Sequence, residues 1–475
     1  MNFKNEILKY PWLNSASQTA KKMKNKVFLV GGFVRDLIIE KESNEMDFLV
    51  IGDGIEFANE FAKELGIKSV IVYRTFGTAH FNYADFSLEF VGARKESYNK
   101  NSRKPDVTIG SFEDDIGRRD FTINTLAISL NENDFGELID HYDGLNDIKN
   151  KLIKTPVDPL ITFDDDPLRI MRAFRFASQL DFKVHDSILD AANKSRDRLK
   201  IVSQERVTDE LLKIIASPKP SIGLKLLHYT GVMEIIFPEI SNLAGVDQRK
   251  DYHHKDVFLH TCMVVDNVAK VSDNVWLRLV ALLHDIAKPQ TKKFVEEIGW
   301  TFHGHEEIGA RMMKGIFKRL KLPLNKLDYV EKLVRLHLRP IALAKDEVTD
   351  SAIRRLIVEA GDDLSDLITL CRADITSKDS NRVSKYLDNY ERVMKKVFEV
   401  LEKDKLRAFQ SPVRGEEIMS ICNLKPSKKV GDIKKAIEEA ILDGKIGNTH
   451  DEALQYLLEI KDKYLSDEKN DDHIV

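Results

Sequence analysis

The spacing of hydrophobic and polar positions changes along the chain. Over about the first 150 residues, short apolar runs such as VFLV, MDFLVIG, SVIVY, AHFNYA and SLEFVGA alternate with helical segments such as IEFANEFAKELG. From about Pro156 onward the pattern becomes long helical periodicity, as in LRIMRAFRFASQL and ERVTDELLKIIAS, with turn signals at SPKPS. Short β-branched runs predict strands, and apolar residues three or four apart predict helices. We therefore expect an α/β domain followed by a remainder that is nearly all α.

Length and polar tracts indicate several domains. The chain has 475 residues, and because single cores stop growing near about 250 to 300 residues, we expect roughly three or four domains. Two polar tracts are candidate joints, NLAGVDQRKDYHHKD near residue 250 and SKDSNRVS at residues 377–384. The last segment contains a predicted amphipathic helix, DIKKAIEEAILDG, and DEKNDDH near the end is predicted to be a frayed tail.

Composition excludes some classes of protein. Charged residues make up 32% of the chain, and no apolar run approaches the length of about 18 residues that a membrane span needs. The first 26 residues lack the apolar core of a secretory signal, so we expect a cytoplasmic protein without a membrane partner. A net charge of -4 means that any nucleic-acid contact must come from local basic patches. Cys262, Cys371 and Cys422 are too far apart for a CxxC zinc site.

Three acidic residues lie on predicted strands. Glu45 and Asp47 are two positions apart in EMDFLV, so both side chains should project from the same face of the strand. Glu89 in SLEFVGA lies on another candidate strand and could supply a third oxygen ligand. Carboxylates on one face attract hard divalent ions, and one or two Mg²⁺ could align a hydroxyl with an α-phosphate. The alternative is a solvated pair of acids at the edge of a strand.

Two glycines precede these acids. Gly31 and Gly32 follow the apolar run VFLV, and a helical segment is expected to start near Arg35. A glycine turn lets backbone N–H groups approach a triphosphate, and the start of the following helix adds positive potential. The alternative is an ordinary turn without a ligand.

Charged residues recur at intervals of three in DDDPLRIMRAFRF, which predicts one flank of a helix for Asp166, Arg169, Arg172 and Arg175. Apolar neighbours such as Phe174 and Phe176 place these charges close to packed side chains, so they are expected to line a cleft. Arginines bind phosphates bidentately. An Asp beside an Arg can also present acceptor and donor atoms to the Watson–Crick edge of a base without a template. The alternative is a ladder of ion pairs on the surface.

The order of these motifs resembles that of the class II tRNA nucleotidyltransferases, the CCA-adding enzymes, and of the related bacterial poly(A) polymerases. GGFVRD with EMD resembles motif A, RRDFTIN motif B, DGLND motif C, DDPLR motif D and QERVTDE motif E. The resemblance covers about residues 20–215 and extends more weakly to the end. It implies an α/β head with a polymerase-β-like mixed sheet, and addition of C, C and A to tRNA 3′ ends from CTP and ATP.

The resemblance also implies roles for residues at matching positions. Glu45 and Asp47 would hold two Mg²⁺ ions, and Asp166 and Arg169 would read the base, supported by Arg172 and Arg175. Contacts to the triphosphate would come from Gly32, Arg35 and Arg119, and Asn124 would assist at the sugar or phosphate.

This chain departs from the family pattern at two positions. The family normally has Asp at the position of Glu45, and because Glu is one methylene longer it must retract or reorient to ligate Mg²⁺, which tolerates little deviation from octahedral geometry. Reduced activity or a changed metal preference would follow. Asp165 stands where the family usually has Glu, which we expect to matter little because Asp166 would read the base.

The resemblance implies four domains. They are a nucleotidyltransferase head at residues 1–155, a helical neck that reads the base and binds RNA at 156–250, an HD domain at 251–385 and a helical tRNA-binding tail at 386–475.

Histidines and aspartates form a second set in the third of these domains. Their order resembles an HD phosphohydrolase domain, with the candidate ligands His260, His284, Asp285, His305, His337 and Asp374. Such a set can hold one or two divalent metals that activate water against a phosphoester. His305 is favoured over His303 because it precedes a predicted helix, and Lys288 could steady a substrate phosphate. The alternatives are a degenerate HD site and a buried histidine with a hydrogen-bonded neighbour.

A lysine-rich turn in the last segment resembles the family's tRNA-binding tail. Lys425, Lys428 and Lys429 precede a predicted helix and suit sequence-independent contacts with backbone phosphates. A solvated lysine loop is the alternative.

Other functions remain open. The same head could make poly(A) tails or only part of CCA. The basic stretch RKESYNKNSRK before RRDFTIN argues against a CC-only enzyme, because the family's flexible loop lies there. The chain could instead be chiefly an HD phosphohydrolase acting on cyclic or terminal phosphates, with an RNA-binding head. It could also be an RNA-binding scaffold with both sites silent.

Overall fold

The computed structural model divides the chain into two compact units. One comprises Met1–Val246 with Lys318–Leu322, and the other comprises Asp247–Phe317 with Pro323–Val475. The structure describes residues 1–74, 77–97, 106–246, 256–297, 299–343, 349–376, 379–404 and 411–465. Most of the first predicted joint, much of the basic stretch RKESYNKNSRK, part of the second joint and the predicted frayed tail lie outside these residues.

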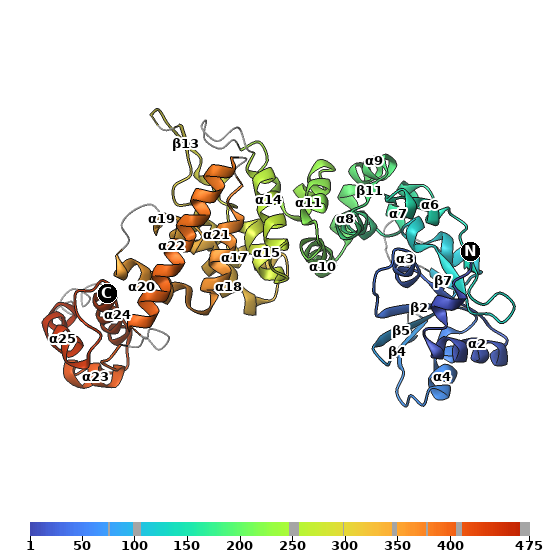
Figure 1. Cartoon of the computed structure of the whole chain (residues 1–475), viewed down its shortest axis with the longest axis horizontal. Helices are drawn as coiled ribbons and strands as arrows, with labels where there is room; N and C mark the ends of the chain where they lie inside the picture. Colours follow the sequence, from blue (N-terminus) through green and yellow to red (C-terminus); the bar gives the residue numbers. More distant parts are fainter. Residues whose placement is uncertain are drawn as a thin grey trace, which may run out of the picture. The chain divides into compact units, whose positions relative to one another are not determined.

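A seven-stranded sheet forms the centre of the head, with the strand order β3-β4-β5-β2-β1-β8-β9 (Figure 1). Strands β2 and β5 pair in parallel, and the other neighbouring strands pair antiparallel, so the sheet is mixed as expected. The strands are β1 (Lys26–Val30), β2 (Glu45–Ile51), β3 (Ile71–Tyr73), β4 (Thr78–Tyr83), β5 (Phe86–Gly92), β8 (Ala127–Ser129) and β9 (Leu138–Ile139).

Helices α2 (Pro11–Met23) and α4 (Gly54–Glu64) cover one face of this sheet (Figure 1). Helix α4 begins at this point because the Asp53 carboxylate accepts hydrogen bonds from the first free backbone N–H groups. The apolar side of α4 packs against every second residue of the strands. The largest fully buried side chains in this core are Phe48, Phe57, Phe61 and Phe90.

The opposite face of the sheet is only partly covered. A cluster that includes Phe28, Leu49 and Ile116 packs helix α5 (Phe112–Gly117) over the part of the face near β1 and β8. Toward β3, in contrast, Ile71 and Tyr73 are 50% and 52% exposed. The predicted acids therefore project from the face that helix packing leaves partly open.

Shorter elements complete the head. Helix α3 (Gly32–Ile38) follows β1 directly, so the expectation of a helix starting near Arg35 placed its start too late. The other elements are α1 (Lys4–Ile7), β6 (Arg94–Ser97), β7 (Asp106–Ile109), η2 (Thr122–Asn124) and α6 (Gly144–Lys149).

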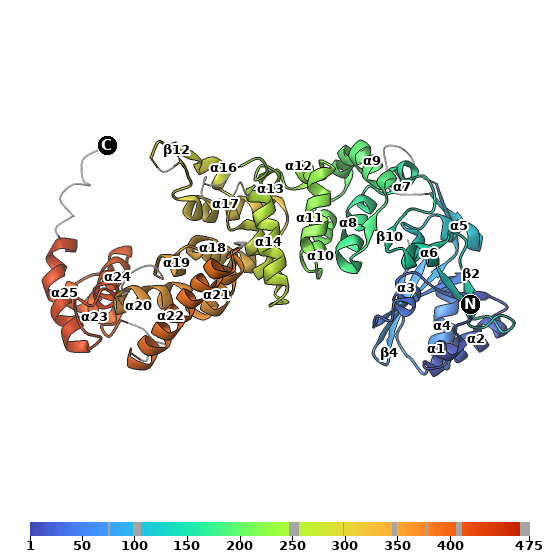
Figure 2. The same cartoon turned by 45° about the horizontal axis from the view of Figure 1, so that its top comes forward.

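The neck is helical, as expected, with one short parallel strand pair formed by β10 (Leu152–Ile153) and β11 (Lys183–Val184). Helix α8 packs against α10 and α11 (Figure 2). A side chain on Gly223 of α11 would approach Ser178 Oγ of α8 to 2.6 Å, so glycine permits this close helix contact. The helices are α7 (Pro159–Asp165), α8 (Leu168–Leu180), α9 (Asp186–Ser195), η3 (Arg196–Ile201), α10 (Gln204–Ile215), α11 (Pro220–Tyr229), α12 (Val232–Ile236) and α13 (Pro238–Ser241).

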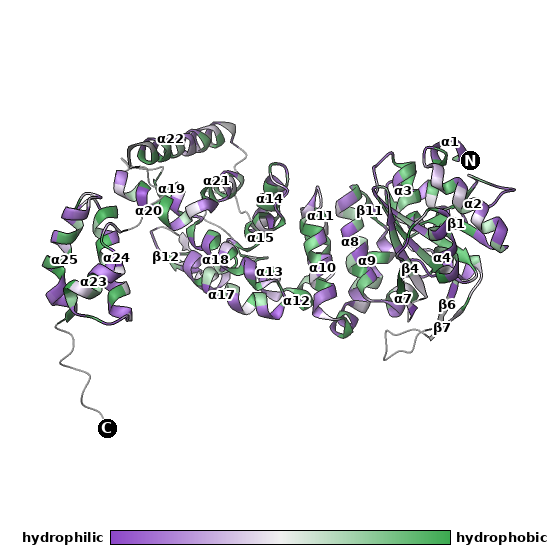
Figure 3. Ribbon diagram, turned by 90° about the horizontal axis from the view of Figure 1, so that it is seen from below, coloured by the Kyte–Doolittle hydropathy of each residue, from purple (hydrophilic) through white to green (hydrophobic). Residues whose placement is uncertain are grey.

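The second unit is also mainly helical, with one short hairpin of β12 (Lys293–Val295) and β13 (Gly299–Thr301). Its helices carry both hydrophobic and hydrophilic residues along their length (Figure 3). They are α14 (Val257–Ala269), α15 (Val275–Leu283), α16 (Lys288–Thr291), α17 (His305–Arg319), η4 (Leu324–Lys326), α18 (Leu327–Leu336), α19 (Arg339–Leu343), α20 (Asp350–Ala360), η5 (Gly361–Asp363), α21 (Leu364–Ala373), α22 (Ser380–Asp404), α23 (Gly415–Cys422), α24 (Lys428–Leu442) and α25 (His450–Leu465).

Helix α22 runs through the predicted boundary between the HD domain and the tail at residues 385 and 386. Its buried Val393 and Val397 pack against Ile353 and Ile357 of α20, so this helix belongs to the HD core along part of its length. Among the described residues, no helix has the length and apolar character needed to cross a membrane.

Candidate functional site

The three predicted acids lie on adjacent parallel strands. Asp47 on β2 stands directly opposite Glu89 on β5, and Glu45 stands opposite Ser87 of the same strand. Side chains two positions apart on a strand share a face, so all three carboxylates project from the same side of the sheet. In the described chain, however, the three do not bring oxygens within 4.8 Å of one another as a group.

The electrostatics of Asp47 fit a cation site. Burial raises the pKa of the Asp47 carboxyl to about 6, the Arg119 guanidinium opposes the rise, and Glu89 and Glu45 add to it by repulsion. A hard divalent cation relieves both the burial cost and the repulsion, because it supplies a local positive charge to oxygen ligands. The charge and oxygen chemistry of this carboxylate set therefore fit a hard divalent cation, with Glu45, Asp47 and Glu89 as the residues that would hold it.

The glycine turn lies directly beside these acids. Gly31 has a φ of +74°, and a side chain there would approach both Asp47 Oδ2 and Arg119 Nη1 to 3.1 Å. Only glycine combines this backbone conformation with so close a neighbour. Arg119 also contacts Asp115, with 3.2 Å between Nη2 and Oδ2. The turn thus brings backbone, a guanidinium and a carboxylate to one place.

A buried network holds Arg35 and Asn124. Arg35 Nη2 lies 2.8 Å from Asp36 Oδ1, and Arg35 Nη1 donates to Asn124 Oδ1 at 2.7 Å. Asn124 Nδ2 donates to Asp120 Oδ1 at 2.9 Å, and Asp120 Oδ2 lies 2.6 Å from Arg172 Nη2. Two residues predicted to contact the nucleotide therefore use polar atoms on protein partners in this structure.

Asp120 is the acid at the centre of this network. Burial alone would raise its pKa, but Arg172, a hydrogen bond from Asn124 and the charge of Arg169 outweigh burial and lower the pKa to about 2. Sequence reasoning missed Asp120 and Asp36. Asp120 lies in the motif RRDFTIN and Asp36 in GGFVRD, and each follows an arginine directly. This adjacency was the feature of the sequence that could have indicated them.

Three arginine guanidinium groups pack against the ring of Phe176. The guanidinium carbons of Arg35, Arg172 and Arg175 lie 5.1, 5.5 and 4.5 Å from its centroid. Arg175 Nη1 also lies 2.8 Å from Glu210 Oε1 in a nearly buried ion pair. Arg172 and Arg175 are thus anchored by protein groups, and their support of Asp166 and Arg169 in base reading stays a prediction.

Asp166 and Arg169 lie close in sequence but use separate partners. Asp166 precedes α8 with an extended backbone, so the prediction that it belongs to the helix flank is wrong. Its Oδ1 accepts from the backbone N–H of Leu168 at 3.1 Å, and its Oδ2 pairs with Arg206 at 2.9 Å. Buried Arg169 donates from Nη2 to the Arg118 carbonyl at 2.7 Å. Sequence reasoning did not name Arg206, although it lies in QERVTDE.

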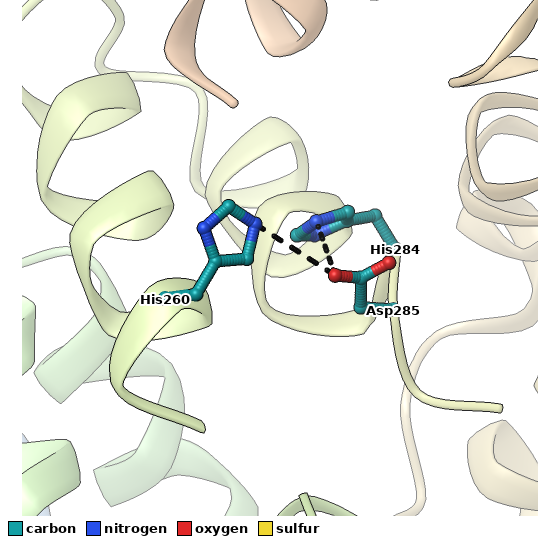
Figure 4. A group of neighbouring side chains, drawn as sticks. All are labelled: His260, His284 and Asp285. Carbon is teal, nitrogen blue, oxygen red and sulfur yellow. Dashed lines mark ion pairs between the residues drawn. The ribbon is translucent and has the colours of Figure 1, made fainter. Parts of the chain in front are cut away.

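The six predicted HD residues gather at the ends of helices of the second unit. Figure 4 shows the His260 and His284 rings directed toward the Asp285 carboxylate. The six residues come from five helices of the fold: His260 from α14, His284 and Asp285 from the end of α15, His305 from the start of α17, His337 from the end of α18 and Asp374 from the end of α21.

Asp285 is shared between two groups of ligand atoms. Its Oδ2 lies 3.2 Å from His284 Nε2 and 3.7 Å from His260 Nε2. Its Oδ1 lies 3.2 Å from His305 Nε2, which in turn lies 3.3 Å from His337 Nε2. Each group, formed by Asp285 with two histidines, brings its ligand atoms within 4.8 Å of one another. This geometry suits one or two divalent ions.

The outer nitrogens of these histidines fix their orientation. Nδ1 of His284, His305 and His337 donates to the carbonyl three residues earlier, at 2.8, 2.7 and 2.7 Å. The fourth ring, His260, contacts Thr376 Oγ1 at 3.0 Å. An N–H donated outward leaves the Nε2 lone pair directed inward, which is the arrangement of metal-binding histidines.

Burial and charge in the cluster also fit a cation. Among the described residues, the buried His284 Nε2 makes no hydrogen bond, and the Lys288 ammonium lies 2.6 Å from the buried Asp285 Oδ2. Burial lowers the pKa of His284, but its pairs with Asp285 and Asp374 outweigh burial and raise it to about 10. Burial lowers the pKa of His337 to about 3, and the charges of His284 and His305 add to this effect. A divalent cation would satisfy the unbonded His284 nitrogen.

Two neighbouring predictions differ in outcome. His303 is exposed, whereas His305 lies in the cluster, so the preference for His305 agrees with the structure. Lys288 Nζ lies 2.6 Å from Asp285 Oδ2, so in this structure it neutralises the shared aspartate. Its contact with a substrate phosphate stays a prediction.

The predicted tail lysines lie at the start of α24. Lys425 is in the preceding turn, whereas Lys428 and Lys429 are the first two helical residues, so only one of the three precedes the helix. Lys425 and Lys428 are exposed, and Lys429 is partly buried.

Three family profiles match the chain in the expected order. Residues 27–154 match the "Poly A polymerase head domain", residues 181–243 the "Probable RNA and SrmB- binding site of polymerase A", and residues 257–379 the "HD domain".

Curated relatives extend this similarity. An A-adding tRNA nucleotidyltransferase of Deinococcus radiodurans is 31% identical over 71% of this chain and 77% of its own length. A CC-adding tRNA nucleotidyltransferase of Thermus thermophilus is 28% identical over 91% of this chain and 93% of its own length. An A-adding enzyme of Aquifex aeolicus is 35% identical over 58% of this chain, and the chain spans only 33% of that longer protein.

Solved structures agree in fold. A CCA-adding enzyme in complex with ATP is 20% identical, with a TM-score of 0.64 over 98% of this chain and 99% of that one. At this identity the match concerns the fold alone.

Proposed function

Because the chain belongs to the tRNA nucleotidyltransferase family, we propose that it adds C, C and A to tRNA 3′ ends from CTP and ATP without a template. The observation that carries this proposal is the position of Asp47, between Glu89 on the next strand and the Gly31 turn with Arg119. One side of these acids thus offers donors for a triphosphate. The cytoplasm is the proposed location, and the tRNA acceptor end is the proposed partner.

The proposed reaction transfers one nucleotide in each step. The 3′-OH of the RNA attacks the α-phosphorus of CTP or ATP, a P–O bond forms, and the bond to the leaving pyrophosphate breaks. When bound by Glu45, Asp47 and Glu89, Mg²⁺ would lower the pKa of the hydroxyl and neutralise charge on the departing oxygens in a two-metal arrangement. The chain itself orients the triphosphate through Gly31, Gly32 and Arg119.

Base selection is proposed for Asp166 and Arg169. Asp166 is held by Arg206 and by the start of α8, and Arg169 is held by the Arg118 carbonyl. These contacts fix where the carboxylate and the guanidinium lie, so that a base of matching edge can hydrogen-bond to both. Arg35 and Asn124 would reach the phosphate or sugar from their buried network.

One assay tests this proposal. A tRNA lacking its CCA end is incubated with the protein, Mg²⁺ and labelled CTP or ATP, and the product ends are sequenced. Three added nucleotides in the order C, C, A are expected. The matched variant His284→Ala should leave addition unchanged, because it alters the other unit.

Partial addition is the main competing outcome, since two of the relatives above are A-adding and one is CC-adding. A second primer that already ends in CC, used beside the first primer that lacks CCA, separates the possibilities. An A-only enzyme would extend just the second primer, a CC-only enzyme would stop after two additions, and a poly(A) polymerase would make long A tracts.

A second activity is proposed for the HD cluster, as a metal-dependent phosphohydrolase acting on cyclic or terminal phosphates. The buried His284 Nε2, which makes no hydrogen bond within the described part of the chain, supports it, because such an atom is costly unless a ligand satisfies it. Hydrolysis of a 2′,3′-cyclic nucleotide is expected, and His284→Ala should abolish it while Asp47→Ala spares it. Absence of hydrolysis with every divalent metal tried, alongside metal binding, would indicate a degenerate site.

A further inference from the structure

A cavity opens on the uncovered part of the head sheet. Its volume is about 350 Å³, and its lining includes Asn44, Glu45, Asn82, Asp85 and Ser87. Glu45 belongs to the acidic set described above, whereas the other four residues have no assigned role. The cavity lies where β2 begins and where β4 turns into β5.

Strand register fixes the cavity relative to the acids. Glu45, Ser87 and Asn82 stand opposite one another across β2, β5 and β4. Asp47 and Glu89 form the next row on the same face of the sheet. Two residues along a strand span about 7 Å. Along the strands, the cavity residues Glu45 and Ser87 are therefore one strand repeat away from Asp47 and Glu89.

The strand order places the cavity and the triphosphate site on opposite sides of Asp47. Gly31 follows β1, on one side of β2, whereas the cavity lies over β5 and β4, on the other side. In phosphoryl and nucleotidyl transfer, the attacking and leaving oxygens lie roughly in line. With pyrophosphate leaving toward the Gly31 turn, the attacking 3′-OH must arrive from the side of the cavity.

The polar lining suits a ribose. Within the described part of the chain, the exposed Asn82 side-chain amide makes no hydrogen bond, so it can offer two N–H donors and one carbonyl acceptor. Ser87 Oγ lies 2.9 Å from His80 Nε2, which holds the hydroxyl in place at the cavity wall. A terminal ribose has two hydroxyls, and each is both donor and acceptor. The 2′-OH is the group that distinguishes RNA from DNA.

We propose that this cavity binds the terminal ribose of the acceptor RNA, and that Asn82 and Ser87 recognise its 2′-OH. His80 acts as a positioning residue through the Ser87 hydroxyl. The inference rests on the proposed nucleotidyl transfer and adds the substrate feature that is read on the acceptor side: a ribonucleotide end with both hydroxyls present.

Two primers that differ in one atom test the inference. Both are tRNAs lacking the last nucleotide to be added, and one carries a 2′-deoxyribose at its 3′ end. The wild-type protein should extend the ribose-ended primer with a kcat/KM about tenfold higher, as expected for one hydrogen bond to a desolvated hydroxyl. Asn82→Ala and Ser87→Ala should each bring the ratio toward one by slowing only the ribose-ended primer.

The ratio is measured within one protein, so a partly unfolded variant does not distort it. Asn133→Ala is the matched control, because Asn133 is exposed and does not line the cavity, and it should keep the wild-type ratio. An unchanged ratio in both cavity variants, or equal use of both primers by the wild-type protein, would overturn the inference while leaving nucleotidyl transfer intact. No extension of either primer would contradict the proposed function and the inference with it.

Discussion

Three acids share one sheet face, and Asp47 is the one with the least contact with water. Its raised pKa follows mainly from burial, with repulsion from Glu89 and Glu45 added. A buried carboxylate lowers the stability of the folded protein when it is ionised without a bound cation. A bound cation offsets this loss. Of the three acids, Asp47 is therefore the one whose loss should lower nucleotide addition most.

Asp47→Asn should lower nucleotide addition by about two orders of magnitude or more, because it removes a charged oxygen ligand at the reacting phosphate. The same change should stabilise the metal-free protein above pH 6. In the wild-type protein the pKa of Asp47 is raised on folding, so ionisation of Asp47 lowers the stability of the folded state as pH rises from about 4 through about 6. Thermal melting of both proteins in chelator at pH 5 and pH 8 measures this effect. Equal melting differences at the two pH values would contradict it.

Glu45 is one of the two positions at which we expect this chain to depart from the family pattern, and shortening its side chain tests the effect of the extra methylene on Mg²⁺ binding. Glu45→Asp should retain addition and reach half-maximal rate at several-fold lower Mg²⁺, because the shorter side chain need not retract. A Mg²⁺ titration of the addition rate compares the two proteins. Glu42→Asp makes the same chemical change at an exposed neighbour and should leave the titration unchanged.

Asp120 carries the opposite kind of shift. Asp120→Asn should destabilise the head by about 2 kcal/mol, because it removes the charged acceptor of the contacts with Asn124 and with Arg172, whose side chain is 34% exposed. Since the folded pKa is depressed to about 2, the stability that Asp120 contributes is present above about pH 4 and is lost as pH falls toward 2. Denaturant unfolding of the head measures it. Glu132→Gln, which breaks an exposed pair with Lys21, should cost less than about 1 kcal/mol.

At the scale of elements, the ends of helices bring the residues of the HD cluster together. The six HD residues come from α14, α15, α17, α18 and α21, and each lies near a terminus or at a turn that faces the others. Four histidines fixed through Nδ1 need little rearrangement to bind a cation. The helices are therefore held together by a cluster that a bound metal would stabilise.

Removal of metal should lower the melting temperature of the second unit. A cation at about 100 times its dissociation constant stabilises by about 2.7 kcal/mol, and a chelator removes this contribution. His284→Ala should lose the sensitivity to chelator, whereas His303→Ala should keep it because His303 lies outside the cluster. Calorimetry with and without chelator measures the difference. Equal sensitivity in the wild type and His284→Ala would argue against metal binding here.

Elements also show what the sequence could and could not predict. Period-two spacing placed Glu45 and Asp47 on one face correctly, because a strand imposes that alternation on any sequence. Spacing alone did not place Asp166, since Pro167 interrupts the helix pattern and leaves Asp166 extended. The partners Arg206 and Asp120 were missed because each pairs across the fold with a residue distant in sequence.

At the scale of the whole molecule, the order of domains followed from motif order. The head, neck and HD segments follow one another in the predicted order, and the three profile matches agree with this order. The boundary within α22 was harder to see, because a helix that packs on the HD core continues toward the tail without a break in periodicity. The three boundaries between the four predicted domains remain predictions.

The central claim is that Glu45 and Asp47 jointly hold Mg²⁺ beside a triphosphate site formed by Gly31, Gly32 and Arg119. A crystal structure with Mg²⁺ and a non-hydrolysable CTP analogue tests it most directly. The account predicts the triphosphate against the glycine turn, with a metal ion between its α-phosphate and the two carboxylates. A triphosphate bound elsewhere, or carboxylates turned away from it, would contradict the account.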